Sequence, residues 1–187
     1  MNFPRILKKR KGYIDRIKPF MQKSVVKVLT GQRRVGKSFL LYQLIEEILA
    51  KEPDANIIYV NLEDFTFSSL QTAEDLHSYI ISHSKEKVKN YIFIDEIQDI
   101  PGFEKVIRSL LLNEDNDIYI TGSNAKMLSG ELATYLSGRY IEFKIYSLSY
   151  SEFLEFHGLT ESETSYELYS RYGGLPYLLN LPLEDET

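Results

Sequence analysis

Apolar residues in this chain of 187 residues follow two alternating patterns, short continuous runs and longer stretches with helical spacing. The continuous runs are rich in Val, Ile, Tyr and Phe, which is typical of strands buried on both faces. They predict five strands, at 24–30, 56–61, 91–95, 118–121 and 140–145. In the longer stretches, apolar residues recur every three or four positions, as on one face of a helix. These stretches predict helices at 39–49, 76–81, 103–111, 151–157 and 161–172.

The alternation of strands and helices determines the expected fold class. Successive strands joined through helices lie parallel, and continuous apolar strands need cover on both faces. We therefore expect an α/β fold with a doubly wound, mostly parallel five-stranded sheet. Residues 23–187 are expected to form this domain, preceded by an N-terminal segment over residues 1–22. The acidic, proline-containing stretch 181–187 favours a longer protein with a further C-terminal domain.

Composition narrows the class of protein. The net charge is −5, which gives no general attraction to nucleic acid, and the absence of cysteine excludes disulfides and thiolate zinc sites. No run approaches the ~20 apolar residues that span a bilayer, and no secretory signal is recognisable. We expect a cytoplasmic protein without a membrane segment. A local basic cluster, residues 8–11, is expected to be either a solvated arm or a contact for nucleic acid or an acidic partner.

A glycine-rich motif joins the first predicted strand to the first predicted helix. It matches G-x-x-x-x-G-K-[ST] at every fixed position, between a strand and a helix as phosphate binding requires. Its residues are Gly31, Gln32, Arg33, Arg34, Val35, Gly36, Lys37 and Ser38. The glycines allow backbone N–H groups to surround phosphate, and the helix adds its positive dipole end. We expect Lys37 to reach the β- and γ-phosphates of ATP, and Ser38 to ligate Mg²⁺.

The third predicted strand ends in two carboxylates, in the form of a Walker B segment. Neighbouring residues at a strand end point to opposite faces, so Asp95 and Glu96 need not have the same role. Asp95 is expected to hold Mg²⁺ through its water shell. Glu96 is expected to orient and deprotonate the attacking water. Acidic residues often end strands in ordinary loops, so this interpretation depends on the phosphate-loop motif beside it.

Two further polar positions are candidates for contact with the γ-phosphate. Ser123 and Asn124 follow the fourth strand, at the edge where an open α/β sheet binds its ligand, although a simple turn has the same composition. Arg139 could stabilise charge on the transferring phosphoryl group, in its own chain or across a subunit contact, or form only a surface ion pair. Arg33 and Arg34 occupy variable loop positions and are expected mainly to face solvent or form local ion pairs.

Five motifs together resemble the AAA-type ATPases of bacteria and archaea that carry an uncharacterised C-terminal domain. They are the loop at 31–38, Ile-Asp-Glu-Ile-Gln at 94–98, Thr-Gly-Ser-Asn at 121–124, Leu-Ser-Gly-Arg at 136–139 and Gly-Gly-Leu-Pro at 173–176. The resemblance implies a central phosphate-loop strand, a sensor at Ser123 or Asn124 and a conditional arginine finger at Arg139. It also implies that the N-terminal segment flanks the nucleotide site, with Tyr13, Ile14, Ile17 or Phe20 enclosing the base. A full helical lid with its sensor arginine is not recognisable before Thr187.

Two functions remain open from the sequence. The first is a Mg²⁺-dependent ATPase that acts as a nucleotide-driven switch or motor module, with oligomerisation and a protein or nucleic-acid partner as further expectations. The second is a nucleotide-gated binding module with negligible hydrolysis. Glu96 favours the first, and the unrecognised lid favours the second. A GTPase is disfavoured because no Asn-Lys-x-Asp element is present, and a Rossmann dehydrogenase because no G-x-G-x-x-G is present.

Overall fold

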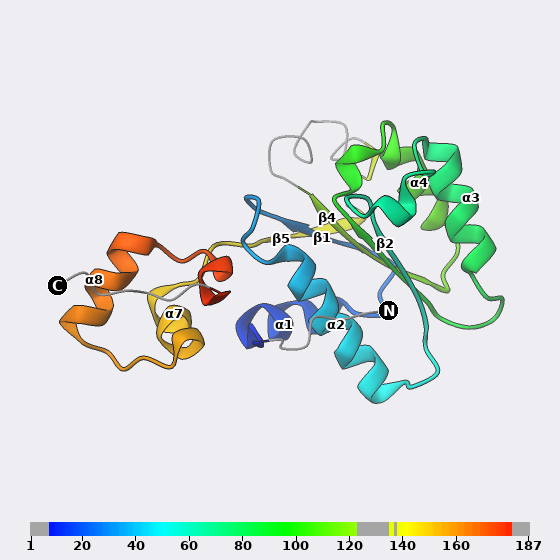
Figure 1. The fold of residues 1–187 in the computed structure, drawn as a ribbon. Helices are drawn as coiled ribbons and strands as arrows, with labels where there is room; N and C mark the ends of the chain where they lie inside the picture. The colour runs from blue at the N-terminus through cyan, green and yellow to red at the C-terminus, as the bar shows by residue number, and fades with distance from the viewer. Residues whose placement is uncertain (1–7, 123–134, 137, 181–187) are drawn as a thin grey trace.

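The five predicted strands form one parallel sheet (Figure 1). The computed structural model describes residues 8–122, 135–136 and 138–180. The strands are β1 (Val26–Thr30), β2 (Asn56–Asn61), β3 (Asn90–Asp95), β4 (Asn116–Gly122) and β5 (Tyr140–Lys144). Their order is β2-β3-β4-β1-β5, and every strand pair is parallel. The predicted doubly wound sheet is confirmed, with the phosphate-loop strand β1 inside it, one position from the centre.

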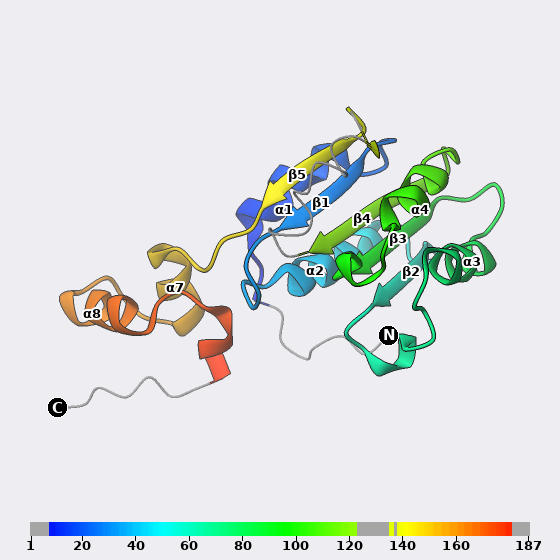
Figure 2. The same cartoon turned by 90° about the horizontal axis from the view of Figure 1, so that it is seen from above.

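Helices cover both faces of the sheet, as Figure 2 shows from above. The pair α1 (Lys11–Ile17) and α2 (Lys37–Lys51) packs on one face, and α3 (Ala73–His83) and α4 (Phe103–Leu110) pack on the other. Short 3₁₀ turns complete the connections: η1 (Lys18–Phe20), η2 (Phe65–Phe67), η3 (Ile97–Asp99) and η4 (Pro176–Asn180).

The alternation of side chains along β3 explains why its apolar run is continuous. Tyr91 and Phe93 belong to the core under α1 and α2, whereas Ile92 and Ile94 belong to the core under α3 and α4. All four are fully buried. Each such side chain stabilises the fold by about 1.5–3 kcal/mol relative to exposure. Both faces of the strand are therefore apolar, as expected of a parallel sheet between helical layers.

A buried polar network lies at the amino ends of β1 and β4, away from the phosphate loop at the carboxyl end of β1. The Lys27 ammonium pairs with the Asp117 carboxylate, and both side chains are fully buried. Asp117 also accepts hydrogen bonds from the Tyr119 hydroxyl and from the Gln22 backbone, each at 2.8 Å. A buried charge is tolerated only when it is paired and hydrogen-bonded. These partners therefore hold the backbone in place where the chain enters β1.

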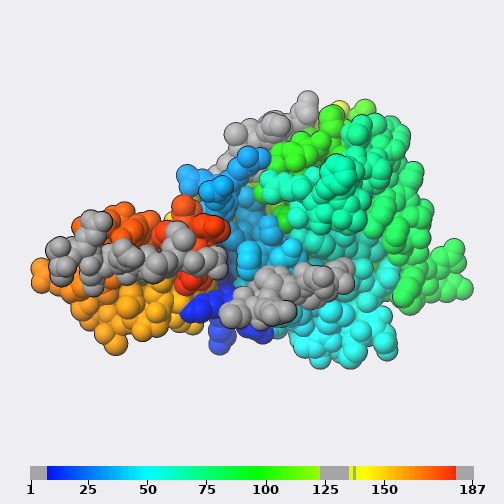
Figure 3. Space-filling model, in the orientation of Figure 1, coloured from blue at the N-terminus to red at the C-terminus, as the bar shows by residue number. Residues whose placement is uncertain are grey.

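The last two helices form a small unit beside the sheet. Helix α7 (Tyr150–His157) and helix α8 (Glu163–Tyr172) pack around an apolar cluster of their own, centred on Phe153. Both helices begin with a capping box, which satisfies free N–H groups of the first turn. In Figure 3 this α7–α8 unit is the orange lobe next to the sheet domain.

Candidate functional site

The phosphate loop connects the carboxyl end of β1 to the start of α2. Gly36 adopts a left-handed conformation at φ 95°, and α2 begins at the next residue, Lys37. A Cβ on Gly31 would lie 2.3 Å from the Ile145 carbonyl oxygen, so only glycine fits there. Val35 is buried and holds the loop on the core beneath it. Because α2 begins at the end of the loop, the free N–H groups of its first turn face the loop. This arrangement binds anions.

Lys37 points back into this loop and is 4% exposed. Its Nζ donates to the carbonyl oxygens of Gly31 at 3.2 Å and Gln32 at 3.1 Å. It also lies 3.2 Å from Oε1 of Glu96, so the end of β3 meets the phosphate loop at this ion pair. Three acceptors thus hold the ammonium at the position where the motif requires a cation for phosphate.

Asp95 lies at the centre of a hydrogen-bond cluster. The hydroxyls of Ser38 and Thr121 bond its carboxylate, and the Tyr59 hydroxyl donates to its Oδ2 at 3.3 Å. Burial raises the pKa of Asp95 above its usual value, and the three hydroxyl donors act against that rise. The contact between Ser38 and Asp95 brings together the two residues expected at Mg²⁺. Thr121 and Tyr59 come from the neighbouring strands β4 and β2.

Glu96 has an uncommon backbone conformation for a residue with a side chain. Its φ of 56° and ψ of 47° lie in the left-handed region, and its N–H donates to Thr121 Oγ1 at 2.9 Å. This turn aims the carboxylate at Lys37 rather than along the strand. The second carboxylate oxygen accepts from Gln98 Nε2 at 2.6 Å. Non-glycine residues in this region cluster at functional sites, because surrounding contacts must hold them there.

The variable positions of the loop are exposed. Gln32, Arg33 and Arg34 all reach solvent, and Arg33 lies 3.8 Å from the Glu63 carboxylate in a surface ion pair. Such exposed pairs contribute little to stability. Contact of the Gln32, Arg33 and Arg34 side chains with nucleotide stays a prediction.

Arg139 lies at the amino ends of the strands, whereas the phosphate loop lies at their carboxyl ends. Its carbonyl accepts from Val26 N at 2.9 Å, at the beginning of β1, whereas the loop follows Thr30 at the end of that strand. Roughly 13 Å of strand separates the two positions. The structure therefore does not bring Arg139 to the site of its own chain. Ser123 and Asn124 lie outside the described residues.

The N-terminal residues expected around the base divide into two groups. Ile14 and Ile17 are buried in the core under α2, so these two side chains cannot contact a base. The Tyr13 hydroxyl accepts from Tyr146 N at 3.1 Å. Phe20 packs on Phe143, with ring centroids 5.8 Å apart. Amphipathic spacing makes Ile14 and Ile17 face the sheet, which is why they serve the core.

The Gly-Gly-Leu-Pro turn after α8 lies next to the phosphate loop. Gly173 ends α8 at φ 74°, which confirms the predicted helix stop. The Gly174 carbonyl accepts a hydrogen bond from Leu148 N at 2.6 Å. A Cβ on Gly36 would lie 3.8 Å from Pro176 Cγ. The turn therefore brings Pro176 against the loop, a proximity that the sequence did not predict.

Substitution of Gly174 by alanine is expected to destabilise the protein by about 1–3 kcal/mol, the usual effect of overpacking. The added Cβ would lie 2.1 Å from the Leu148 carbonyl oxygen, so backbone must move. Chemical denaturation measures the change. Gly12→Ala is the matched control, because nothing lies within 4 Å of a Cβ there and alanine suits a helix. Equal denaturation midpoints for the two variants would contradict the expectation.

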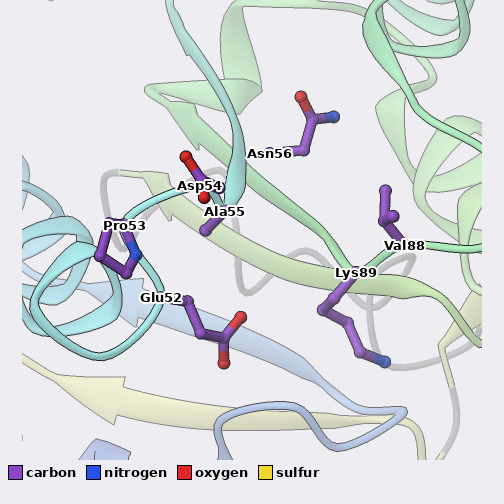
Figure 4. A pocket seen from close by; sticks show the side chains of 7 residues that line it. All are labelled: Glu52, Pro53, Asp54, Ala55, Asn56, Val88 and Lys89. Atoms are coloured by element: carbon purple, nitrogen blue, oxygen red, sulfur yellow. The ribbon is translucent and has the colours of Figure 1, made fainter.

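A pocket of about 270 Å³ lies away from this site (Figure 4). Its lining comes from the turn before β2 and the residues before β3, at the amino ends of these strands. The lining residues are Glu52, Pro53, Asp54, Ala55, Asn56, Val88 and Lys89. None of the sequence-predicted site residues contributes to it.

The site offers few protein ligands for a metal ion. Within the described part of the chain, no group of three or more His, Asp or Glu side chains is placed to hold a metal. The Ser38 hydroxyl and the Asp95 carboxylate are oxygen donors, which Mg²⁺ prefers. Mg²⁺ is usually bound by one or two such protein groups together with substrate phosphates and water, so this donor set fits it.

The fold and the site together define a P-loop nucleoside triphosphatase domain. A family model described as an AAA domain matches residues 23–154. The chain belongs to this AAA family. No helix among residues 8–122, 135–136 and 138–180 has the length and apolar character needed to cross a membrane.

Two curated relatives match over much of this chain. It is 41% identical over 178 residues to an uncharacterized protein of Haemophilus influenzae, covering 89% of this chain and 43% of that protein. It is 38% identical over 132 residues to the uncharacterized protein MJ1544 of Methanocaldococcus jannaschii, covering 70% of this chain and 28% of that protein. The chain thus spans less than half the length of either relative.

Three solved structures have a similar fold. The Walker-type ATPase paby2304 of Pyrococcus abyssi matches with a TM-score of 0.60 and 16% identity, over 93% of this chain and 65% of that chain. AMPPCP-bound DnaA of Aquifex aeolicus matches at 0.57 and 13%, over 94% and 61%. Aeropyrum pernix ORC1 in complex with DNA matches at 0.56 and 14%, over 88% and 50%. At these identities the likeness shows the fold alone.

Proposed function

We propose that this AAA domain binds ATP with Mg²⁺ and hydrolyses it, as a nucleotide-driven switch within a longer protein. The observation that carries the proposal is the convergence of Lys37, Ser38, Asp95 and Glu96. Two of these side chains stand at the start of α2 and two at the end of β3, and they meet in two contacting pairs, Lys37 with Glu96 and Ser38 with Asp95. Each is the residue type that one part of phosphoryl transfer to water requires.

Binding of the triphosphate uses groups already oriented in the loop. The N–H groups at the start of α2 face the position of the phosphates, and Lys37 supplies a cation there. Lys37 now bonds two carbonyls and Glu96. Phosphate oxygens carry more negative charge than a carbonyl, so they compete well for the ammonium. Mg²⁺, held by Ser38 and Asp95, would supply further neutralisation of phosphate charge.

Hydrolysis requires Glu96 to act on water rather than on Lys37. When phosphates take over the Lys37 ammonium, the Glu96 carboxylate loses its ion-pair partner and becomes able to accept a proton from water. Gln98 and the backbone bond to Thr121 hold the carboxylate in the site meanwhile. Arg139 lies away from the phosphate loop of its own chain, so an arginine finger at this position would act on the nucleotide of a neighbouring subunit, and oligomerisation is part of this proposal.

Thermal unfolding with ATP, ADP and GTP, each with and without Mg²⁺, tests the binding directly. A ligand at 100 times its Kd stabilises the folded chain by about 2.7 kcal/mol, which raises the melting temperature measurably. We expect stabilisation by ATP and ADP, larger with Mg²⁺, and little by GTP. A melting temperature that none of these nucleotides changes would overturn the proposal.

Thr121→Val is expected to weaken Mg²⁺ binding at saturating ATP by about 10- to 100-fold, the usual effect of losing a group that orients a metal ligand. Thr121 donates to Asp95 and accepts from Glu96 N, and valine does neither. Titration of Mg²⁺ followed by calorimetry measures the loss. Thr160→Val, at an exposed position, is the matched control. Equal Mg²⁺ affinity in both variants would show that Thr121 does not position Asp95.

The second candidate is a nucleotide-gated binding module with negligible turnover. It is favoured by one observation, that both oxygens of the Glu96 carboxylate are already engaged, one with Lys37 and one with Gln98. Single-turnover measurement with Mg²⁺ and ATP separates the two functions. Phosphate release that depends on Glu96 supports the ATPase, whereas tight ATP binding without release supports the binding module.

A further inference from the structure

A short N-terminal segment, residues 8–10, lies between the phosphate-loop helix and the α7–α8 unit. Gln43 of α2 holds it at two points: its Oε1 accepts from Arg10 N at 3.0 Å, and its Nε2 donates to the Lys8 carbonyl at 3.1 Å. Gln43 is 2% exposed, so water does not compete for these bonds. In Figure 3 the dark blue N-terminal residues lie against the orange lobe.

The Arg10 side chain joins three parts of the molecule. Its Nη1 donates to the carbonyl of Val35 in the phosphate loop at 3.2 Å and to the carbonyl of Tyr146 after β5 at 2.8 Å. Its Nε and Nη2 donate to the two carboxylate oxygens of Glu152 in α7, each at 2.8 Å. The guanidinium also lies 4.5 Å from the centre of the Tyr13 ring. One planar cation therefore contacts the phosphate loop and α7 at the same time.

Burial makes this arrangement specific. Arg10 is 4% exposed, and a buried guanidinium needs an acceptor for most of its N–H groups. Burial tends to raise the pKa of Glu152, but the hydrogen bonds from Arg10 and Ser149 outweigh this and hold that pKa below its usual value. The carboxylate is thus charged and paired. A lysine could not make the same two parallel bonds to Glu152 together with bonds to carbonyls.

The same segment also holds the other end of α7. The Lys8 ammonium donates to the Phe156 carbonyl in the last turn of α7, and it lies 5.9 Å from the centre of the Phe156 ring. A cation at the carboxyl end of a helix satisfies a free carbonyl and complements the helix dipole. The segment therefore attaches to α7 at its first turn through Glu152 and at its last turn through Phe156.

We propose that Arg10 is a positioning residue that couples nucleotide occupancy of the phosphate loop to the α7–α8 unit. The inference rests on the proposed function, because it requires nucleotide at the loop. When the loop closes around phosphate, the Val35 carbonyl changes position relative to Arg10. The same guanidinium bonds Glu152, so the change alters how firmly α7 is held. Arg10 and Lys8 of the basic cluster thereby have intramolecular partners, whereas Lys9 and Lys11 are exposed.

Hydrogen exchange of the whole 187-residue chain, with and without Mg²⁺ and the β,γ-methylene analogue of ATP, tests this coupling. In the wild type we expect slower exchange both at the phosphate loop and at α7, which the analogue need not touch. Coupling between sites typically changes an equilibrium by roughly 5- to 150-fold, and we expect slowing within that range at α7. Glu152→Gln should keep the protection of the loop and lose most of the protection of α7.

The Glu152→Gln variant separates coupling from simple stability. Glutamine still accepts the capping hydrogen bond from Ser149 N, so the start of α7 is retained. The readout is the change that nucleotide causes, which a purely structural role of Glu152 would leave intact. Glu155→Gln is the matched control, an exposed carboxylate in the same helix. It should behave as the wild type. Arg10→Ala should lose the α7 protection more completely than Glu152→Gln.

The outcomes distinguish this inference from the proposed function. Equal nucleotide-dependent protection of α7 in the wild type and in Glu152→Gln would overturn the coupling. So would protection of the loop without any protection of α7 in the wild type. Absence of protection at the wild-type phosphate loop would overturn the proposed function, and the coupling with it.

Discussion

Lys37→Ala is expected to abolish measurable ATP binding. The Lys37 ammonium is the one loop cation that the structure holds inside the site, at 3.1–3.2 Å from two loop carbonyls and from Glu96. A hydrogen bond to a charged group contributes about 1.5–3 kcal/mol, so two such bonds to phosphate account for at least about a hundredfold in affinity. The variant also leaves the Glu96 carboxylate unpaired where the phosphates would lie, which opposes binding further.

Calorimetric titration with Mg²⁺ and ATP measures the effect, and thermal unfolding without nucleotide shows that the variant is folded. Lys51→Ala is the matched control, because it is the same substitution at the exposed last turn of the same helix. It should bind ATP as the wild type does. An unchanged ATP affinity in Lys37→Ala would remove the phosphate-loop assignment, since no other described residue supplies a buried cation at the loop's phosphate position.

Glu96→Gln is expected to lower ATP turnover by about 10²- to 10⁴-fold while ATP binding persists, the usual contribution of a positioned acid or base. The amide retains the shape of the side chain and can still bond Gln98, but it cannot take a proton from water. Binding should be equal or tighter, because the substitution removes a negative charge 3.2 Å from Lys37. That charge competes with the triphosphate for the ammonium in the wild type.

Phosphate release at saturating ATP measures the turnover, and calorimetry measures the affinity of the same preparation. Glu74→Gln, at an exposed position in the first turn of α3, is the control and should leave both unchanged. Turnover of Glu96→Gln at the wild-type rate would place the base elsewhere. A wild type that binds ATP but releases no phosphate would favour the nucleotide-gated binding module.

Features that depend on neighbouring residues are predictable from the sequence of this protein. The continuous apolar run of β3 and the strand–loop–helix context of the phosphate loop are properties of neighbouring residues, so periodicity and motif spacing predict them. Helix ends also depend on neighbouring residues. The predicted end of α8 at Gly173 is confirmed, because Gly173 is the C-cap of this helix and has a positive φ. The five parallel strands followed from alternation of elements, because a parallel connection needs a crossover helix.

Contacts between residues far apart in the sequence depend on the tertiary structure. Asp95 receives hydrogen bonds from Thr121 on β4 and Tyr59 on β2, which become its neighbours only through strand order and register. Strand order brings Arg139 beside Val26 at the start of β1, because β5 pairs with β1 and not with its neighbour in sequence, β4. In sequence Arg10 is one of four basic residues, yet the fold buries it between Val35 and Glu152. Charge alone cannot indicate burial, because a partner 142 residues away supplies the compensating carboxylate.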